Sequence, residues 1–198
     1  MISLMVVFYM FLVIFAIIGG LRGWAKEMLV IFSVVLALFL IFLLEKFEFF
    51  VVPFESIYLD PGGPAVFFET LAADTQSGLK TQFWIRTLIV ITLVFFGYQT
   101  PGLSRFAAAV RREKVQDFIL GVVFGLLNGY LVVGTIWSFM DSAQYPFSPL
   151  IVSPAAGDPL GEAALRWIAL LPPLWLGSEP GIYVAVGLAF LFVLVVFI

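Results

Sequence analysis

The sequence contains no cysteine and no histidine. Their absence excludes disulfide bonds, thiolate chemistry, imidazole ligation of haem or chlorin, and most zinc and copper sites. Acidic residues such as Glu55, Asp60, Asp158 and Glu162 are accompanied by no nucleophile motif and no phosphate-binding glycine loop. We therefore expect solvated acidic loops rather than catalytic carboxylates, and we predict no enzyme, no metal and no cofactor.

Charge is scarce as well. Asp, Glu, Lys and Arg make up 12% of the 198 residues, whereas a soluble domain carries roughly 25%. Hydrophobic residues make up 63% of the chain, and a small soluble domain cannot hide such a share, because much of its surface faces solvent. The net charge of −3 and the lack of a basic stripe argue against a nucleic-acid partner. The composition predicts an all-α membrane protein whose partners are lipids.

The uncharged runs predict a polytopic bundle of about four or five transmembrane helices. The first run has 18 residues and reaches about 27 Å, close to the thickness of a bilayer. We interpret it as a retained helix, because no basic segment precedes it and no small-residue cleavage site follows it. The expected spans are residues 2–19 and 28–44, a hairpin within 1–44; residues 83–103 and 118–140, a second pair within 83–140; and residues 182–198.

Two long segments rich in acid, proline and glycine, residues 45–82 and 141–181, are predicted as outer loops with helices at the membrane interface. One such helix is expected at residues 65–73. The second begins at Asp158, an N-cap followed by proline at the first helical position. An i, i+4 pair of Glu162 and Arg166, with Trp167 and Trp175 as interfacial anchors, makes this piece amphipathic.

Six of the ten Lys and Arg lie in two short segments, the hairpin turn at residues 20–27 and residues 98–117. Ten of the thirteen acids lie in the two long loops. The positive-inside rule therefore places the short segments in the cytoplasm and the long loops outside. In the second short segment, the cations contribute topology control and lipid docking, or alternatively they dock a cytoplasmic partner. The six cations predicted to anchor the chain to lipid are Arg22, Lys26, Arg105, Arg111, Arg112 and Lys114.

The fourth span carries glycine at every fourth position: Gly121, Gly125 and Gly129. Such a strip lets another helix backbone come close. It packs either against the first or second span of the same chain or against a partner helix or second copy. Ser33, Asn128 and Ser138 are expected to hydrogen-bond between helices.

No Asp, Glu, Lys or Arg lies in the middle of an expected span, and Trp84 and Arg86 are interpreted as anchors at the outer end of the third span. Pumps and proton-coupled transporters rely on ionisable groups inside the membrane. The sequence therefore argues against transport driven by protonation.

Two stretches carry a family resemblance: residues 17–27 (IIGGLRGWAKE), a charged glycine turn between two spans, and residues 116–129 (QDFILGVVFGLLNG). Together they resemble the CvpA family, the colicin V production proteins of bacteria, over roughly residues 1–45 and 85–140. In that family an acidic-basic pair typically precedes the glycine strip, and a basic residue often stands where Asn128 stands here. The resemblance implies four spans, a location in the inner membrane, and a role in secretion or envelope maintenance.

Three hypotheses follow. The first is a non-enzymatic bacterial inner-membrane protein of the CvpA type. The second is a structural accessory subunit of a larger respiratory or photosynthetic complex, which would contact other transmembrane subunits. The third, which the few intramembrane polar groups favour least, is a channel or facilitator. Independently of these hypotheses, a second copy of the chain in a homo-oligomer is also a candidate partner.

Overall fold

The computed structural model describes residues 4–47, 69, 71–99, 114–147, 150–155 and 157–197. Within these residues the chain is all-helical and has no strand. The helices are α1 (Leu4–Arg22), α2 (Trp24–Lys46), α3 (Ala73–Tyr98), α5 (Lys114–Ser142), α6 (Pro159–Ile168), α7 (Pro172–Leu176) and α8 (Gly181–Phe197).

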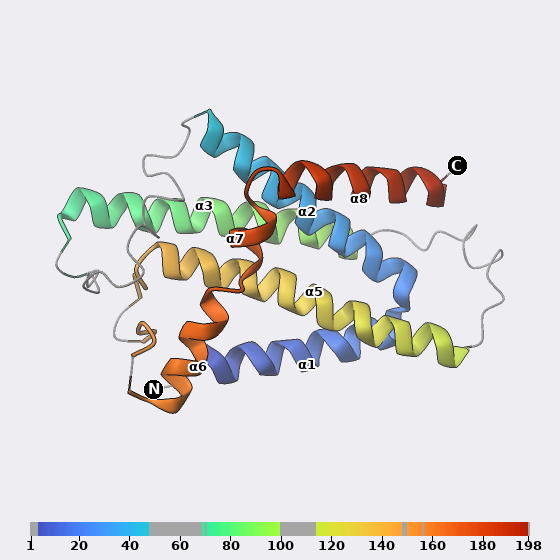
Figure 1. The fold of residues 1–198 in the computed structure, drawn as a ribbon, viewed down its shortest axis with the longest axis horizontal. Helices are drawn as coiled ribbons and strands as arrows, with labels where there is room; N and C mark the ends of the chain where they lie inside the picture. The colour runs from blue at the N-terminus through green and yellow to red at the C-terminus, as the bar shows by residue number, and fades with distance from the viewer. Residues whose placement is uncertain are drawn as a thin grey trace.

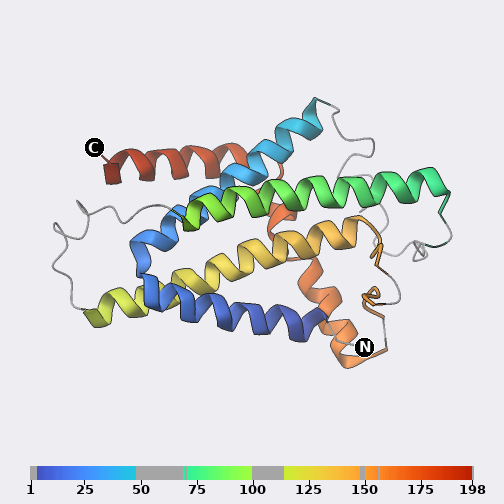
Figure 2. The ribbon, with the colours of Figure 1, turned by 180° about the vertical axis from the view of Figure 1, so that it is seen from behind.

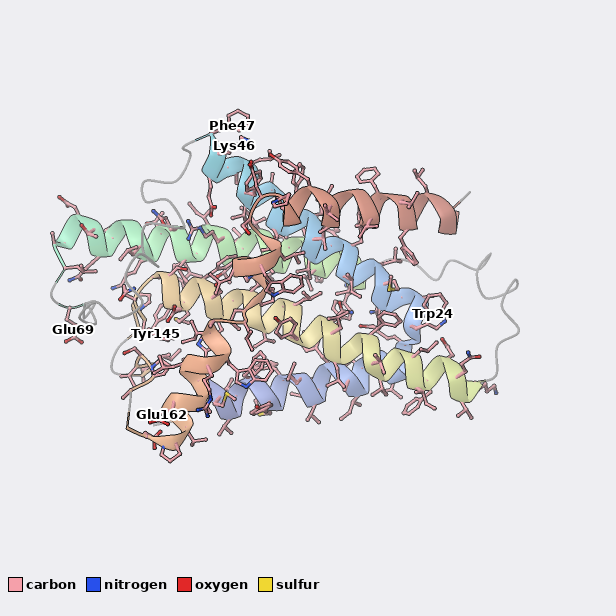
Figure 3. All side chains as sticks on the ribbon, in the orientation of Figure 1. Trp24, Lys46, Phe47, Glu69, Tyr145 and Glu162 are labelled. Atoms are coloured by element: carbon pink, nitrogen blue, oxygen red, sulfur yellow. The ribbon has the colours of Figure 1, made fainter. Side chains whose placement is uncertain are left out.

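The four long helices lie side by side as a bundle, with α5 in contact with α1, α2 and α3 (Figures 1 and 2). We call one end of the bundle the turn end: it holds the α1–α2 turn at Gly23, the last residue of α3 and the first residue of α5. The opposite end, with the last residues of α2 and α5 and the first of α3, is the loop end. In Figure 3, Trp24 marks the turn end of α2, and Lys46 and Phe47 mark its loop end.

Four helices, α1, α2, α3 and α5, are long and apolar enough to cross a membrane. A fifth crossing depends on whether the pair formed by residues 159–176 and 181–192, bent by 66°, counts as one broken span. The apolar helices therefore indicate a membrane-embedded protein, as the composition predicted. Many of their large side chains remain exposed on the bundle surface, which suits acyl chains as the solvent.

The helices extend beyond the apolar runs from which they were predicted. α2 begins at Trp24 rather than at residue 28, α5 begins at Lys114 rather than at 118, and α3 begins at Ala73 rather than at 83. The first turns of α3 carry exposed polar residues such as Asp74 and Lys80, which hydropathy alone assigns to a loop. Residues 100–103 of the expected third span, and most of the helix expected at 65–73, lie outside the described residues.

A strap formed by α6 and α7 crosses one face of the bundle: α6 contacts α1 and α5, and α7 contacts α5 and α2. The predicted N-cap of α6 is confirmed, since the Asp158 carboxylate accepts the Gly161 N–H at 3.0 Å. The predicted pair of Glu162 and Arg166 is not formed, because no ion pair joins these two described residues.

The tryptophans of the strap bind the bundle through their indole N–H groups. Trp167 donates to the Tyr9 hydroxyl and Trp175 to the Tyr130 hydroxyl, each at 3.1 Å. Pro172, the first residue of α7, packs against α5 at Gly134. A Cβ added at Gly134 would stand 3.0 Å from the proline ring. The anchors predicted to face the membrane interface therefore also fasten the strap to α1 and α5.

At the loop end, Lys46 of α2 donates to the Glu179 carboxylate at 3.0 Å and thereby ties α2 to the segment before α8. The Lys46 hydrogen bond, followed by that of Tyr183, holds the pKa of the Glu179 carboxyl below its ordinary value. A lowered pKa in the folded state stabilises the fold above the ordinary pKa, and this stabilisation is lost as the pH falls through the lowered value. Both side chains are exposed, so the contribution is small.

We therefore expect Lys46→Met to lower the melting temperature slightly at pH 7 and by less at pH 3, because acid protonates the Glu179 carboxylate that the pair requires. Thermal unfolding followed by intrinsic fluorescence at the two pH values checks this. Glu179→Gln is the matched control, and adding Lys46→Met to it should have no further effect at pH 7. An equal loss at both pH values would show that the ion pair is not the cause.

Candidate functional site: a glycine contact and two buried polar clusters

The glycine strip of α5 lies directly against α1. A Cβ added at Gly121 would stand 2.3 Å from the Gly19 carbonyl oxygen, and one added at Gly125 would stand 2.3 Å from the Phe15 carbonyl oxygen. At Gly129 the nearest atom would be the Cβ of Phe15 at 3.0 Å. Since no side chain fits between the two backbones, α1 and α5 approach as closely as small-residue strips allow. Of the two partners considered for the strip, the structure places the first span of the same chain against it.

At the turn end, the buried carboxylate of Glu27 contacts side chains from the other three long helices. Glu27 lies in the first turn of α2 and is fully buried. Arg22 of α1 donates to its Oε1 at 2.7 Å, and Asn128 of α5 donates to its Oε2 at 2.7 Å. The Tyr98 hydroxyl of α3 lies 3.5 Å from the same Oε2. We call these four residues the turn-end polar cluster.

Further contacts fix the geometry of the turn-end polar cluster. The Arg22 guanidinium lies 4.3 Å from the centre of the Tyr98 ring and also donates to the Tyr98 carbonyl at 2.9 Å. Asn128 donates a second hydrogen bond, at 3.0 Å, to the Glu27 carbonyl. The cluster joins one residue from each long helix, so it fixes the position of the α1–α2 turn relative to α3 and α5.

Gly23, the residue between α1 and α2, has φ of +84°, a conformation that residues with a Cβ rarely adopt. The Asp117 carboxylate of α5 accepts the N–H of Trp24 at 3.3 Å. A Cβ at Gly23 would come within 2.6 Å of this carboxylate. The tight turn therefore requires glycine, and an added Cβ would also displace the Asp117 carboxylate.

We expect Gly23→Ala to lower stability by about 2 kcal/mol or more, because left-handed strain and the clash with Asp117 add. Gly157→Ala is the matched control, since Gly157 has φ of +94° but nothing within 4 Å of an added Cβ. Chemical or thermal unfolding in detergent should show the larger loss for Gly23→Ala. Equal losses would mean that the Asp117 contact does not constrain the turn.

A second buried polar cluster lies at the loop end, between α2 and α3. Arg86, in the middle of α3, is 2% exposed and pairs with Glu45 of α2 at 3.2 Å. Gln82 and Thr87, on the same buried face of α3, are each 4% exposed. We call these four residues the loop-end polar cluster. The prediction that Arg86 anchors the outer end of a span was wrong, because α3 begins earlier and turns this side chain inward; Trp84, by contrast, is exposed.

The six cations predicted to anchor the chain to lipid fall into three groups. Lys26 and Lys114 are exposed at the turn end. Arg22 instead turns inward onto Glu27, and its side chain is 20% exposed. Arg105, Arg111 and Arg112 lie outside the described residues.

Of the three polar residues expected to bond between helices, Asn128 does so, whereas the Ser33 hydroxyl donates to Leu29 within α2. Ser138 is buried on α5. The one signal in the sequence for the turn-end polar cluster was this asparagine, but nothing indicated that its partner would be Glu27.

Within the described ranges, no three acidic side chains converge as the ligands of a metal ion would. Comparison of the chain with models of known families, with curated proteins and with solved structures finds no match.

Proposed function

We propose that this chain is a non-enzymatic protein of the bacterial cytoplasmic membrane, of the CvpA type, which supports secretion or envelope maintenance. The observation that carries the proposal is that the two stretches with the family resemblance, residues 17–27 and 116–129, form one structural unit. They are nearly a hundred residues apart in the sequence, yet Gly19 packs against Gly121. Two hydrogen bonds also join them: the Trp24 N–H donates to the Asp117 carboxylate, and the Asn128 amide donates to the Glu27 carboxylate. Two motifs that share one three-dimensional unit are more informative than two separate short matches.

The proposed orientation places the turn end in the cytoplasm. Exposed Lys26 and Lys114 lie at this end, and the basic segment 100–113 joins two helix ends there. Cations flanking spans favour the cytoplasmic side, and the acidic loops then face outward. Reporter fusions after residue 112 and after residue 153 would test the orientation, because an enzyme active only outside the cytoplasm should work at the second site alone.

Complementation tests the proposed role. In a bacterium that lacks its own CvpA-type protein but carries the colicin V genes, this chain should restore the zone of growth inhibition on a sensitive lawn. Gly125→Leu, which is expected to disrupt the α1–α5 contact, is the negative control, and Gly187→Leu is the matched positive control. Failure of the wild-type chain, present in the membrane at normal amounts, would contradict the proposal.

The alternative is a structural accessory subunit of a larger membrane complex, and α8 is the observation that favours it. Tyr183, Leu188, Phe190, Leu191 and Leu194 of α8 are all exposed, and among the long helices the described residues of α8 pack mainly against α2. An apolar helix with one packed side leaves the other free for a neighbouring subunit as well as for lipid. Native-size analysis after mild extraction distinguishes the two, since a stable, stoichiometric assembly supports the subunit and a monomer or homo-oligomer opposes it.

A further inference from the structure

Two members of the loop-end polar cluster, Gln82 and Thr87, place polar atoms where the described protein supplies no hydrogen-bond partner. Both polar atoms of the Gln82 amide and the Thr87 hydroxyl are buried without a partner among the described residues. Arg86 and Glu45 add a guanidinium and a carboxylate to the same small region. Leaving a buried polar group unsatisfied costs about 1–3 kcal/mol, so several together require a ligand that can donate and accept.

The arrangement of the helices supports water as that ligand. Charged side chains inside membrane bundles pair with one another or face water-filled cavities. Glu45 also lines a cavity of about 20 Å³, formed with Phe139 of α5 and with Pro173 and Gly177 of the strap. A cavity of this size holds about one water molecule. The cluster therefore combines the unpartnered Gln82 amide and Thr87 hydroxyl with space beside Glu45 on the scale of one water molecule.

An apolar barrier separates this region from the turn end. Val30 and Val34 of α2 and Val90 and Val94 of α3 lie between the two polar clusters along both helices, and each is at most 8% exposed. We call these residues the valine layer. Along α2, 18 positions separate Glu27 from Glu45, which is about 27 Å of helix. Polar groups thus occupy both ends of the α2–α3 interface, and the valine side chains pack in its middle.

We propose that the loop-end polar cluster is an internal hydration site, which binds water through Gln82, Thr87 and the Arg86–Glu45 pair and which ends at the valine layer. Water reaches the middle of α3 from the loop end and goes no further. The ligand class is water, because the amide and hydroxyl can both donate and accept, and because the space beside Glu45 is on the scale of one water molecule. This inference stands independently of the role in secretion.

The absence of native cysteine permits a clean test. Single thiols are introduced as Thr87→Cys and Val90→Cys, and the purified proteins in lipid nanodiscs receive millisecond X-ray pulses that convert nearby water into hydroxyl radicals. Both parent residues are almost fully buried, and they lie three positions apart on α3. We expect the thiol in Thr87→Cys to oxidise at least about tenfold faster, as measured by mass spectrometry. Equal rates would overturn the proposal.

The sign of a stability change gives a second, independent test that does not depend on an introduced thiol. If the Thr87 hydroxyl binds water, its replacement in Thr87→Val should lower the melting temperature in nanodiscs. If the hydroxyl instead lies in a dry core without a hydrogen-bond partner, Thr87→Val should raise the melting temperature, because the apolar isostere removes a desolvated polar group. Thr81→Val, at an exposed position earlier on α3, is the matched control for helix propensity. A rise for Thr87→Val would overturn the proposal.

Discussion

Replacing Gly125 by leucine should lower the free energy of unfolding by about 3 kcal/mol or more. We expect only a small fraction of the variant to remain folded in detergent. The first added carbon would already stand 2.3 Å from the Phe15 carbonyl oxygen and 3.0 Å from the Gly19 Cα. Both atoms belong to the α1 backbone, so no change of side-chain rotamer relieves the clash. Overpacking in a core typically costs about 1–3 kcal/mol, and separating two helices adds to this.

The chain provides its own control for this experiment. Gly187 lies within α8, and a Cβ added there meets nothing within 4 Å. Gly187→Leu should be neutral or slightly stabilising, because leucine favours helix more than glycine does. Heating of the detergent-solubilised proteins, followed by size-exclusion chromatography with fluorescence detection, measures the surviving folded fraction. If Gly125→Leu survives heating as well as Gly187→Leu, the close α1–α5 contact is not present in the native protein.

The fold follows from the sequence wherever apolar runs and their breaks determine it. The four long helices were predicted because lipid-exposed spans need long uncharged runs, and the glycine strip of α5 was visible as a four-residue repeat. The start of α3 was not predictable in this way. Its first ten residues are largely polar and exposed, and hydropathy does not distinguish a solvated helix from a loop.

The two polar clusters illustrate why the sites were harder to predict than the helices. Considered within its own segment, Glu27 is a carboxylate in the first turn of a helix, where the helix dipole favours negative charge. Arg86, considered in the same way, is an interfacial anchor. Their burial depends on which neighbours face them: Asn128 lies 101 residues from Glu27, and Glu45 lies at the far end of a different helix. Such pairings are set by helix rotation and packing in three dimensions, which the order of residues along one helix does not specify.

The turn-end polar cluster predicts the clearest non-additive result in the protein. Arg22→Met alone leaves the fully buried Glu27 carboxylate without its cation, and we expect a loss of about 3–5 kcal/mol. Adding Glu27→Leu removes the unpaired buried charge, and Asn128 keeps its hydrogen bond to the backbone carbonyl of position 27. We therefore expect the double variant to recover most of the stability lost in Arg22→Met, because buried ion pairs are replaced by apolar residues at little net cost.

A double-mutant cycle in one detergent at pH 7 provides the measurement, with the coupling energy taken from the four unfolding free energies. Lys26→Met is the matched control, since Lys26 is exposed in the same turn and its removal should change stability by less than about 0.5 kcal/mol. A coupling energy near zero between positions 22 and 27 would mean that the charges are not paired in the folded protein. A large coupling, together with a stable double variant, would indicate that the pair is retained for something other than stability, since apolar residues would then hold the four helices together equally well.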